Sequence, residues 1–151
     1  MSVLATKLKL QRYPSRKSVA DAALCAQQPF SMKQLLLHLK RTHAVTSKAT
    51  AYRTVTLLVE NELLREPFLF EGEWIYFPAT RKNEMLWICT DCRKASLLPS
   101  SPVNYFLREY AAQHGLQPET LMVHVKYTCL NRDDCKKHQS GNDGVSRIWP
   151  D

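Results

Sequence analysis

The sequence has little glycine and no long apolar run, and these two features exclude several classes of protein. Glycine occurs 4 times in 151 residues, and neither G-x-G-x-x-G nor G-x-x-x-x-G-K is present, which excludes a glycine-rich phosphate loop. No apolar run approaches the ~20 residues of a membrane span, and no basic-then-apolar leader precedes a small-residue cleavage site. We therefore expect a soluble, cytoplasmic protein with no membrane partner.

Acidic residues are scarce in the first part of the chain. Residues 1–60 carry 10 Lys and Arg but only two acids, Asp21 and Glu60, whereas residues 61–151 carry 11 basic and 12 acidic residues. This uneven charge indicates that the front part meets a polyanion such as nucleic acid, although a solvated charged surface would have the same composition.

The basic part is expected to form three helices. Helical composition runs over residues 15–28, and Ser31 with Gln34 forms a capping-box pattern at the start of a second helix. A third helix is expected from a Thr46–Ser47 cap to about Asn61. The apolar stripes of the second and third helices are Met32, Leu35, Leu36 and Leu39, and Ala51, Val55, Leu58 and Val59.

The third helix carries basic, hydroxyl and aromatic side chains away from its apolar stripe. They are Lys48, Thr50, Tyr52, Arg53, Thr54 and Thr56. Two helices joined by a short turn, the second with such a face, are typical of a helix-turn-helix and its reading helix. Strand-like runs over residues 64–70 and 74–77 add a β-hairpin. We therefore predict a winged-helix domain over residues 1–80.

The remaining chain predicts a second, smaller domain over residues 81–137. Strands are expected over 85–89, 95–98 and 121–127, with a helix that Ser101–Pro102 begins and Gly115 ends. Residues 138–151 are polar and contain Gly141 and Gly144, so we expect a disordered tail there.

Four of the five cysteines form two close pairs, Cys89-x2-Cys92 and Cys129-x5-Cys135. A cytosolic protein keeps its thiols reduced, so we expect a zinc site rather than disulfides. Four thiolates leave no open position for water, which makes such a site structural. A redox C-x-x-C is the alternative, and His138 is an alternative ligand because the second spacing is loose. Cys25 lies among small residues and is expected in the core.

An enzyme is not expected. A zinc deaminase needs an H-x-E partner and a proline before its cysteine pair, and both are missing. No nucleophile–base grouping has support either.

The segment Ser47-Lys48-Ala49-Thr50-Ala51-Tyr52-Arg53-Thr54-Val55 resembles the recognition-helix signature S-x-A-T-x-Y-R-T-[LV] of the ferric uptake regulator family. Pro14-Ser15-Arg16 is similar to the family's T-P-Q-R, and Glu62-Leu63-Leu64 to its E-x-G-L-[VI] without the glycine. Residues 86–94 (LWICTDCRK) resemble the family's L-I-C-x-x-C-G-K. Residues 108–115 (REYAAQHG) resemble its dimer-domain helix. Cys129 and Cys135 resemble its second cysteine pair. The likeness covers about residues 8–137.

The resemblance implies an α+β protein: an N-terminal winged helix-turn-helix domain followed by a small α/β dimerisation domain with structural zinc. It implies a homodimeric transcriptional repressor that binds AT-rich inverted repeats of double-stranded DNA. On the matching positions Tyr52 would touch a thymine methyl and Arg53 a base or phosphate, as the chemistry of the major groove also favours. Ser47, Lys48 and Thr50 would meet phosphates, and Arg12 is a candidate for a narrow minor groove. For Tyr52 a half-buried core position, and for Lys48 and Arg53 a solvated face, are the alternatives.

The family's regulatory Fe²⁺, Zn²⁺ or Mn²⁺ ligands are mostly replaced in this sequence. Only Glu109 keeps a carboxylate at a matching position. The replacements are Gln28 or Pro29, Phe77, the segment Lys82-Asn83-Glu84-Met85-Leu86, Leu97 and Leu121. One carboxylate cannot hold an ion that prefers several N/O ligands, so we expect DNA binding without a regulatory metal. A site rebuilt from His114, His124, Glu84 or His138 is the alternative.

Two other functions stay open at this point. One is an interaction subunit that forms a heterodimer with a metal-sensing paralogue. The other is a regulator in which oxidation of the zinc thiolates ejects the metal.

Overall fold

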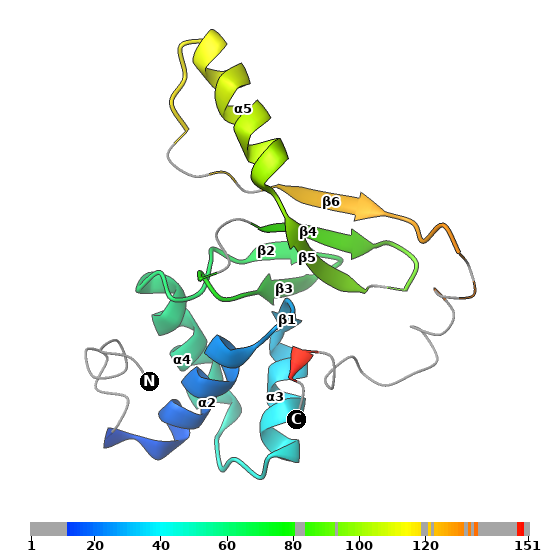
Figure 1. The fold of residues 1–151 in the computed structure, drawn as a ribbon. Helices are drawn as coiled ribbons and strands as arrows, with labels where there is room; N and C mark the ends of the chain where they lie inside the picture. Colours follow the sequence, from blue (N-terminus) through cyan, green and yellow to red (C-terminus); the bar gives the residue numbers. More distant parts are fainter. Residues whose placement is uncertain are drawn as a thin grey trace. The chain divides into compact units, whose positions relative to one another are not determined.

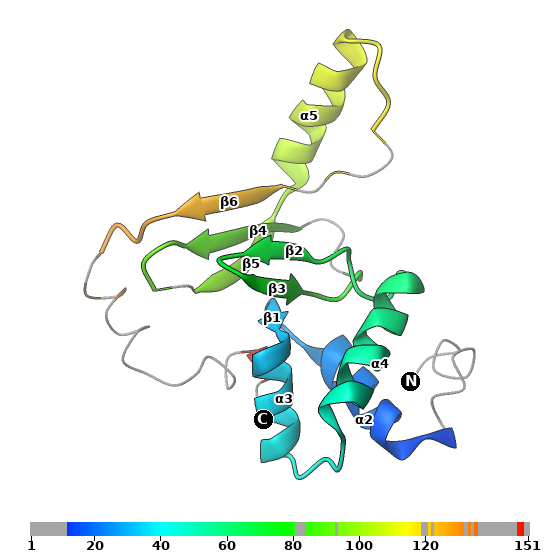
Figure 2. The ribbon, with the colours of Figure 1, turned by 180° about the vertical axis from the view of Figure 1, so that it is seen from behind.

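The structure is a computed structural model that describes residues 12–80, 84–92, 94–118, 121, 123–131, 133, 135, 148 and 149. The chain divides into two compact units: unit 1 comprises Met1–Thr80 with Asn142–Asp151, and unit 2 comprises Arg81–Gly141. Helices with a small sheet make up unit 1, and a second sheet with one helix makes up unit 2 (Figures 1 and 2). The features expected at Lys82, Asn83, His138, Gly141 and Gly144 lie outside the described residues.

Unit 1 is built around three helices, α2 (Pro14–Cys25), α3 (Met32–Arg41) and α4 (Lys48–Glu60). Their apolar stripes face one another and form the core, as the helical spacing predicts. The largest fully buried side chains of this core are Phe30, Leu35, Leu58, Leu64, Val19 and Val55.

Side-chain caps fix where α3 and α4 begin. The Ser31 side chain accepts from the Gln34 N–H at 3.4 Å and the Gln34 side chain accepts from the Ser31 N–H at 2.8 Å, which confirms the predicted capping box. The Ser47 hydroxyl accepts a hydrogen bond from the Thr50 N–H at 3.1 Å and so caps α4.

The C-terminal ends of α3 and α4 use left-handed residues that are not glycine. After α4, Glu62 has φ 56° and its N–H donates to the Val59 carbonyl, while the Leu63 N–H donates to the Leu58 carbonyl. After α3, His43 has φ 54° in the same arrangement. This is the Schellman motif, which ordinarily places glycine at that position. Because glycine is scarce in this chain, residues with a side chain take the strained left-handed backbone conformation at both helix ends.

A three-stranded sheet of order β1-β3-β2 completes unit 1. β2 (Phe68–Phe70) and β3 (Glu73–Tyr76) form the predicted hairpin, and β1 (Phe30–Ser31) pairs with β3. At the hairpin turn Glu71 and Gly72 have φ of 48° and 83°, which fits a two-residue hairpin turn. Strand β2 is shorter than the strand expected over residues 64–70, because residues 64–67 make only an isolated bridge from Leu64 to Pro78.

Three expectations for unit 1 are wrong. Cys25 is exposed rather than buried in the core. Thr54 is buried on the core side of α4, where its hydroxyl donates to the Thr50 carbonyl at 2.8 Å. The expected disorder of residues 138–151 fails at Ile148 and Trp149, which are buried in the core of unit 1.

Unit 2 contains a second sheet of order β5-β4-β6. The central strand β4 (Glu84–Cys89) is antiparallel to β5 (Ala95–Pro99) and parallel to β6 (His124–Tyr127). Helix α5 (Ser101–Gln113) connects β5 to β6 and ends at Gly115, with φ 71°, as predicted. Its N-cap is Ser100, one residue before the expected cap, and β6 begins three residues later than the expected strand.

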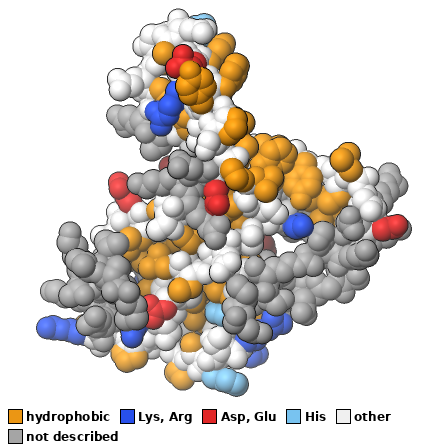
Figure 3. All heavy atoms as spheres, in the orientation of Figure 1, with side chains coloured by type: hydrophobic (Ala, Val, Ile, Leu, Met, Phe, Trp, Pro, Cys, Tyr) orange, Lys and Arg blue, Asp and Glu red, His pale blue; other side chains and the backbone are white. Residues whose placement is uncertain are grey.

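Helix α5 has no buried residue. Apolar side chains gather on it instead of facing a core (Figure 3). Tyr105 is 70% exposed, Phe106 64% and Tyr110 54%. Within the described part of the chain, this helix therefore lacks the packing that an amphipathic helix ordinarily finds.

Candidate zinc and DNA-binding sites

The four paired cysteines converge in unit 2. Their Sγ atoms all lie within 4.8 Å of one another. The sulfur of Cys89 is 3.8 Å from that of Cys135 and 3.5 Å from that of Cys129, and Cys92 and Cys129 are 3.9 Å apart. The alternative of a redox pair beside two unrelated cysteines is therefore wrong.

The sheet brings the two pairs together. Cys89 ends β4, and its register partner Tyr127 ends the parallel strand β6, so both strands deliver the chain to the same edge. The Thr90 N–H donates to the Tyr127 carbonyl at 2.9 Å and holds the two ends side by side. Cys92 and Cys129 follow these ends within three residues.

The cluster fits a tetrahedral zinc ion. Zn–S bonds of about 2.3 Å in a tetrahedron place neighbouring sulfurs about 3.8 Å apart. The separations of 3.5–3.9 Å between these sulfurs lie around this value. With four thiolates no coordination position remains for a substrate or water, so the chain's cysteines can hold a structural zinc ion, and His138 is not needed as a ligand.

The thiols are already unequal before a metal binds. Burial raises the pKa of Cys89, but the Cys92 and Asp91 N–H groups and two neighbouring thiols outweigh burial and lower it to about 6. The hydrogen bond with Cys89 raises the pKa of Cys129 to about 11. Cys89 therefore ionises more readily than Cys129, and zinc binding would displace protons from the cluster.

The predicted reading helix α4 presents a polar face to solvent. Tyr52 is 44% exposed, and the Lys48 Nζ lies 5.8 Å from the centroid of its ring. Arg53 is exposed beside it, while Ala51, Val55 and Leu58 are buried on the other side. Tyr52 is therefore half-buried, as the alternative of a half-buried core position also has it, and the exposed part of this face can meet a ligand.

The same face continues onto α2 through a residue that sequence reasoning did not select. A groove of about 410 Å³ lies between Arg16 of α2 and Tyr52, Arg53 and Glu60 of α4. The Arg16 guanidinium stacks on Tyr13, 4.9 Å from the ring centroid. Arg16 lies in the segment that resembles the family's T-P-Q-R, and this resemblance was the sequence signal that could have identified it. Arg12 is exposed just before α2.

The positions expected to have lost regulatory ligands lie in both units. In unit 1 Phe77 is 1% exposed and the Gln28 Oε1 is buried without a hydrogen-bond partner among the described residues. In unit 2 Leu97 is buried and Glu109 is exposed on α5. Among the described residues, the cysteine cluster is the only group of three or more His, Cys, Asp or Glu side chains close enough to share a metal ion.

This chain resembles one family model and several solved structures. The model of the ferric uptake regulator family matches residues 7–126. A search of curated protein sequences finds no significant match.

Several solved structures share the fold. The Helicobacter pylori ferric uptake regulator has a TM-score of 0.72 at 12% identity, covering 89% of this chain and 91% of its own. The Vibrio cholerae ferric uptake regulator has a TM-score of 0.68 at 17% identity, covering 82% and 99%. The Campylobacter jejuni peroxide stress regulator has a TM-score of 0.66 at 20% identity, covering 87% and 99%.

No helix within the described residues is long and apolar enough to cross a bilayer. The family match spans both the reading helix and the first cysteine pair. The chain therefore belongs to the ferric uptake regulator family, whose members are transcription regulators and not enzymes.

Proposed function

We propose that this protein is a dimeric, sequence-specific DNA-binding repressor that needs no regulatory metal. Helix α4 enters the major groove of an AT-rich inverted repeat, and the zinc-bound unit 2 joins two copies. The exposed Lys48, Tyr52 and Arg53 on α4 carry this proposal.

The chemistry of α4 matches what DNA offers. The Tyr52 ring is an apolar surface for a thymine methyl, and Arg53 is a donor for a base edge or phosphate. Ser47 and Thr50 stand at the N-terminal end, where free N–H groups and the helix dipole favour phosphate. Lys48 beside Tyr52, and Arg16 across the groove from Tyr52 and Arg53, add positive charge.

The wing is a poorer partner for the backbone of DNA. The wing is the β2–β3 hairpin; Glu71 lies in its turn and Glu73 begins β3, and their negative charge disfavours a phosphate at the tip. Trp74, 52% exposed on β3, offers an apolar contact instead. The main contacts therefore come from α4 and from the start of α2, including Arg12.

Dimer formation is supported by helix α5, which buries no residue within the described part of the chain. A row of exposed aromatic side chains on a helix without buried residues is costly in a monomer. Two copies that pair along α5 would bury these rings, and the two-fold symmetry of such a dimer matches an inverted repeat.

Independence from a regulatory metal is supported by the residues at the substituted positions. A phenyl ring at Phe77 and an alkyl chain at Leu97 supply no lone pair, and the amide of Gln28 is a weak ligand compared with an imidazole. Glu109 alone cannot replace them.

Fluorescence anisotropy tests the proposal directly. Zinc-loaded protein is titrated onto a labelled fragment of its own promoter region, with and without Fe²⁺ or Mn²⁺ under anaerobic conditions, with shuffled DNA as the reference. We expect specific binding that added metal does not change. Binding only after Fe²⁺ or Mn²⁺ is added would contradict metal independence, and equal binding to shuffled DNA would contradict sequence specificity.

Substitutions locate the interface. Arg53→Ala is expected to weaken specific binding by roughly 5- to 150-fold, and Lys48→Ala to lower the slope of log affinity against log salt by about 1. Lys126→Ala on β6 removes the same charge from unit 2 and is the matched control. Equal losses from Lys126→Ala and Lys48→Ala would show that only net charge matters.

A further inference from the structure

The residues Ile148 and Trp149 are fixed to the end of helix α2 by two hydrogen bonds. The Trp149 Nε1–H donates to the Ala22 carbonyl at 2.7 Å, and the Gln27 N–H donates to the Ile148 carbonyl at 2.9 Å. Ala22 lies in the last turn of α2 and Gln27 follows its end. Ile148 and Trp149 are only 4% and 7% exposed. Both residues are therefore buried with the Trp149 Nε1–H and the Ile148 carbonyl hydrogen-bonded, as is typical of a specific packing contact.

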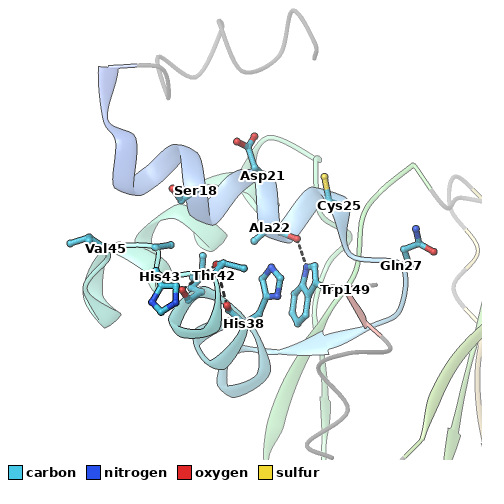
Figure 4. A pocket seen from close by; sticks show the side chains of 12 residues that line it. Ser18, Asp21, Ala22, Cys25, Gln27, His38, Thr42, His43, Val45 and Trp149 are labelled. Carbon is cyan, nitrogen blue, oxygen red and sulfur yellow. Dashed lines mark hydrogen bonds between the residues drawn. The ribbon is translucent and has the colours of Figure 1, made fainter. Parts of the chain in front are cut away.

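The indole lies between α2 and α3 (Figure 4). It stacks on His38 of α3, with ring centroids 4.4 Å apart and an interplanar angle of 14°. It also contacts Phe30 of β1, just before α3, with ring centroids 5.5 Å apart. One side chain therefore touches both helices that support the reading helix.

The composition of α2 explains why the indole is accommodated. The buried side chains of α2 are small: Val19, Ala20, Ala22 and Ala23. Since protein interiors are close-packed, small side chains on one helix leave volume that another group must fill. A groove of about 760 Å³ runs between α2 and α3, and Trp149 lines its end near Gln27, while Val45 lies at the other end (Figure 4).

We propose that the place where the indole sits, formed by Ala22, His38 and Phe30, is a binding seat for a tryptophan-bearing peptide segment, and that its occupant is the chain's own Ile148–Trp149. The occupied seat fixes α3 against α2, and α4 follows α3 after a short link. Removal of the indole then weakens DNA binding although no DNA-facing residue changes, a consequence that rests on the proposed function.

The seat is tested first in the unmodified, full-length protein. Nuclear Overhauser effects are expected between the Trp149 indole and the Ala22 and His38 side chains. Slow hydrogen exchange is expected at the Gln27 amide, which is bonded to Ile148. Absence of the indole contacts would overturn the proposal without any variant.

Full-length Trp149→Ala is expected to lose roughly 10 °C or more in Tm. Trp149→Phe keeps the aromatic packing but not the N–H bond, so a smaller loss is expected. Equal Tm for wild type and Trp149→Ala would overturn the proposal.

Addition in trans separates a binding site from ordinary core packing. A peptide of residues 142–151 is added to full-length Trp149→Ala at roughly millimolar concentration, comparable with the effective concentration of a tethered segment. It is expected to restore part of the lost Tm, whereas the same peptide with Ala for Trp149 is not. Equal effects of the two peptides would refute a tryptophan site.

DNA affinity is measured last, with and without the peptide. If the peptide restores Tm while even the wild type fails to bind DNA, the proposed function fails and the seat stands. If wild type binds DNA but the peptide does not restore Trp149→Ala, the seat fails and the proposed function stands.

Discussion

Removal of zinc is expected to unfold unit 2 and to leave unit 1 folded. The reason is the small apolar core of the described part of unit 2. Apart from two of the cysteines, its buried apolar side chains are Met85, Leu86, Ile88 and Leu97. Helix α5 adds none.

The magnitudes favour a metal-dependent fold. Burial of four such side chains contributes about 6–12 kcal/mol. The three strands contain six, five and four residues, and fixing their backbone costs roughly 15–30 kcal/mol. The shortfall is comparable with the roughly 10–16 kcal/mol that a structural zinc ion supplies.

The assay is a ¹H–¹⁵N correlation spectrum of the full-length protein before and after chelation, with zinc content measured on the same sample. Amide signals of β4, β5 and β6 are expected to collapse to unfolded positions, while those of α3 and α4 keep their dispersion. Cys92→Ser should behave as the chelated protein does. Cys25→Ser changes an exposed cysteine outside the cluster and should retain one zinc ion per chain. Dispersed β4 signals in verified zinc-free protein would refute the reasoning.

Three further predictions concern unit 1. Glu62→Gly should raise the free energy of unfolding by roughly 1 kcal/mol, since glycine relieves the left-handed φ of 56° after α4; a lower Tm in a thermal melt would contradict this. Ser47→Ala should lower it by about 1 kcal/mol, because the Thr50 N–H loses its cap, and an unchanged urea midpoint would show that the cap contributes nothing. Burial, and then the charge of Arg41, lowers the pKa of His38 from 6.5, so the folded state binds fewer protons than the unfolded state. Stability should therefore be full above about pH 6.5 and fall below it, by more in wild type than in His38→Gln; parallel pH profiles from chemical denaturation would count against this.

Local signals predicted helix ends in both units because they depend on neighbouring residues. The Ser31–Gln34 capping box and the Gly115 helix end are such signals, and the structure confirms both. The cysteine spacing predicted the convergence in unit 2, since zinc chemistry demands four ligands wherever the chain brings them.

The wrong predictions for Thr54 and Cys25 arose because the chemical type of the side chain and its position on the helix indicate different burial. Thr54 is three residues after Ala51 and four before Leu58, so helical spacing places it in the buried stripe, but its hydroxyl suggested an exposed side. Cys25 is two residues after the buried Ala23, which turns it by about 200° to the opposite side of α2. In both cases the phase of the helix outweighs the chemistry of the side chain.

The burial of Trp149 could not be predicted from periodicity. Ile148 and Trp149 stand in a polar segment without a repeating apolar pattern, and their partners lie more than 100 residues earlier in the sequence. The complementary signal was the run of small residues in α2, which an isolated three-helix core would leave underpacked. Only tertiary structure joins these two observations.

One position where the family resemblance places a regulatory ligand is occupied by a buried phenylalanine. Phe77 is 1% exposed, and the guanidinium of Arg65 lies 5.1 Å from the centroid of its ring. A carboxylate at this position would be buried, and a buried charge is stable only with a partner, for which the Arg65 guanidinium is a candidate. A single Phe77→Glu substitution is therefore expected to place a carboxylate beside Arg65 without supplying the other ligands. On the proposed function, metal sensing would require several substitutions at once.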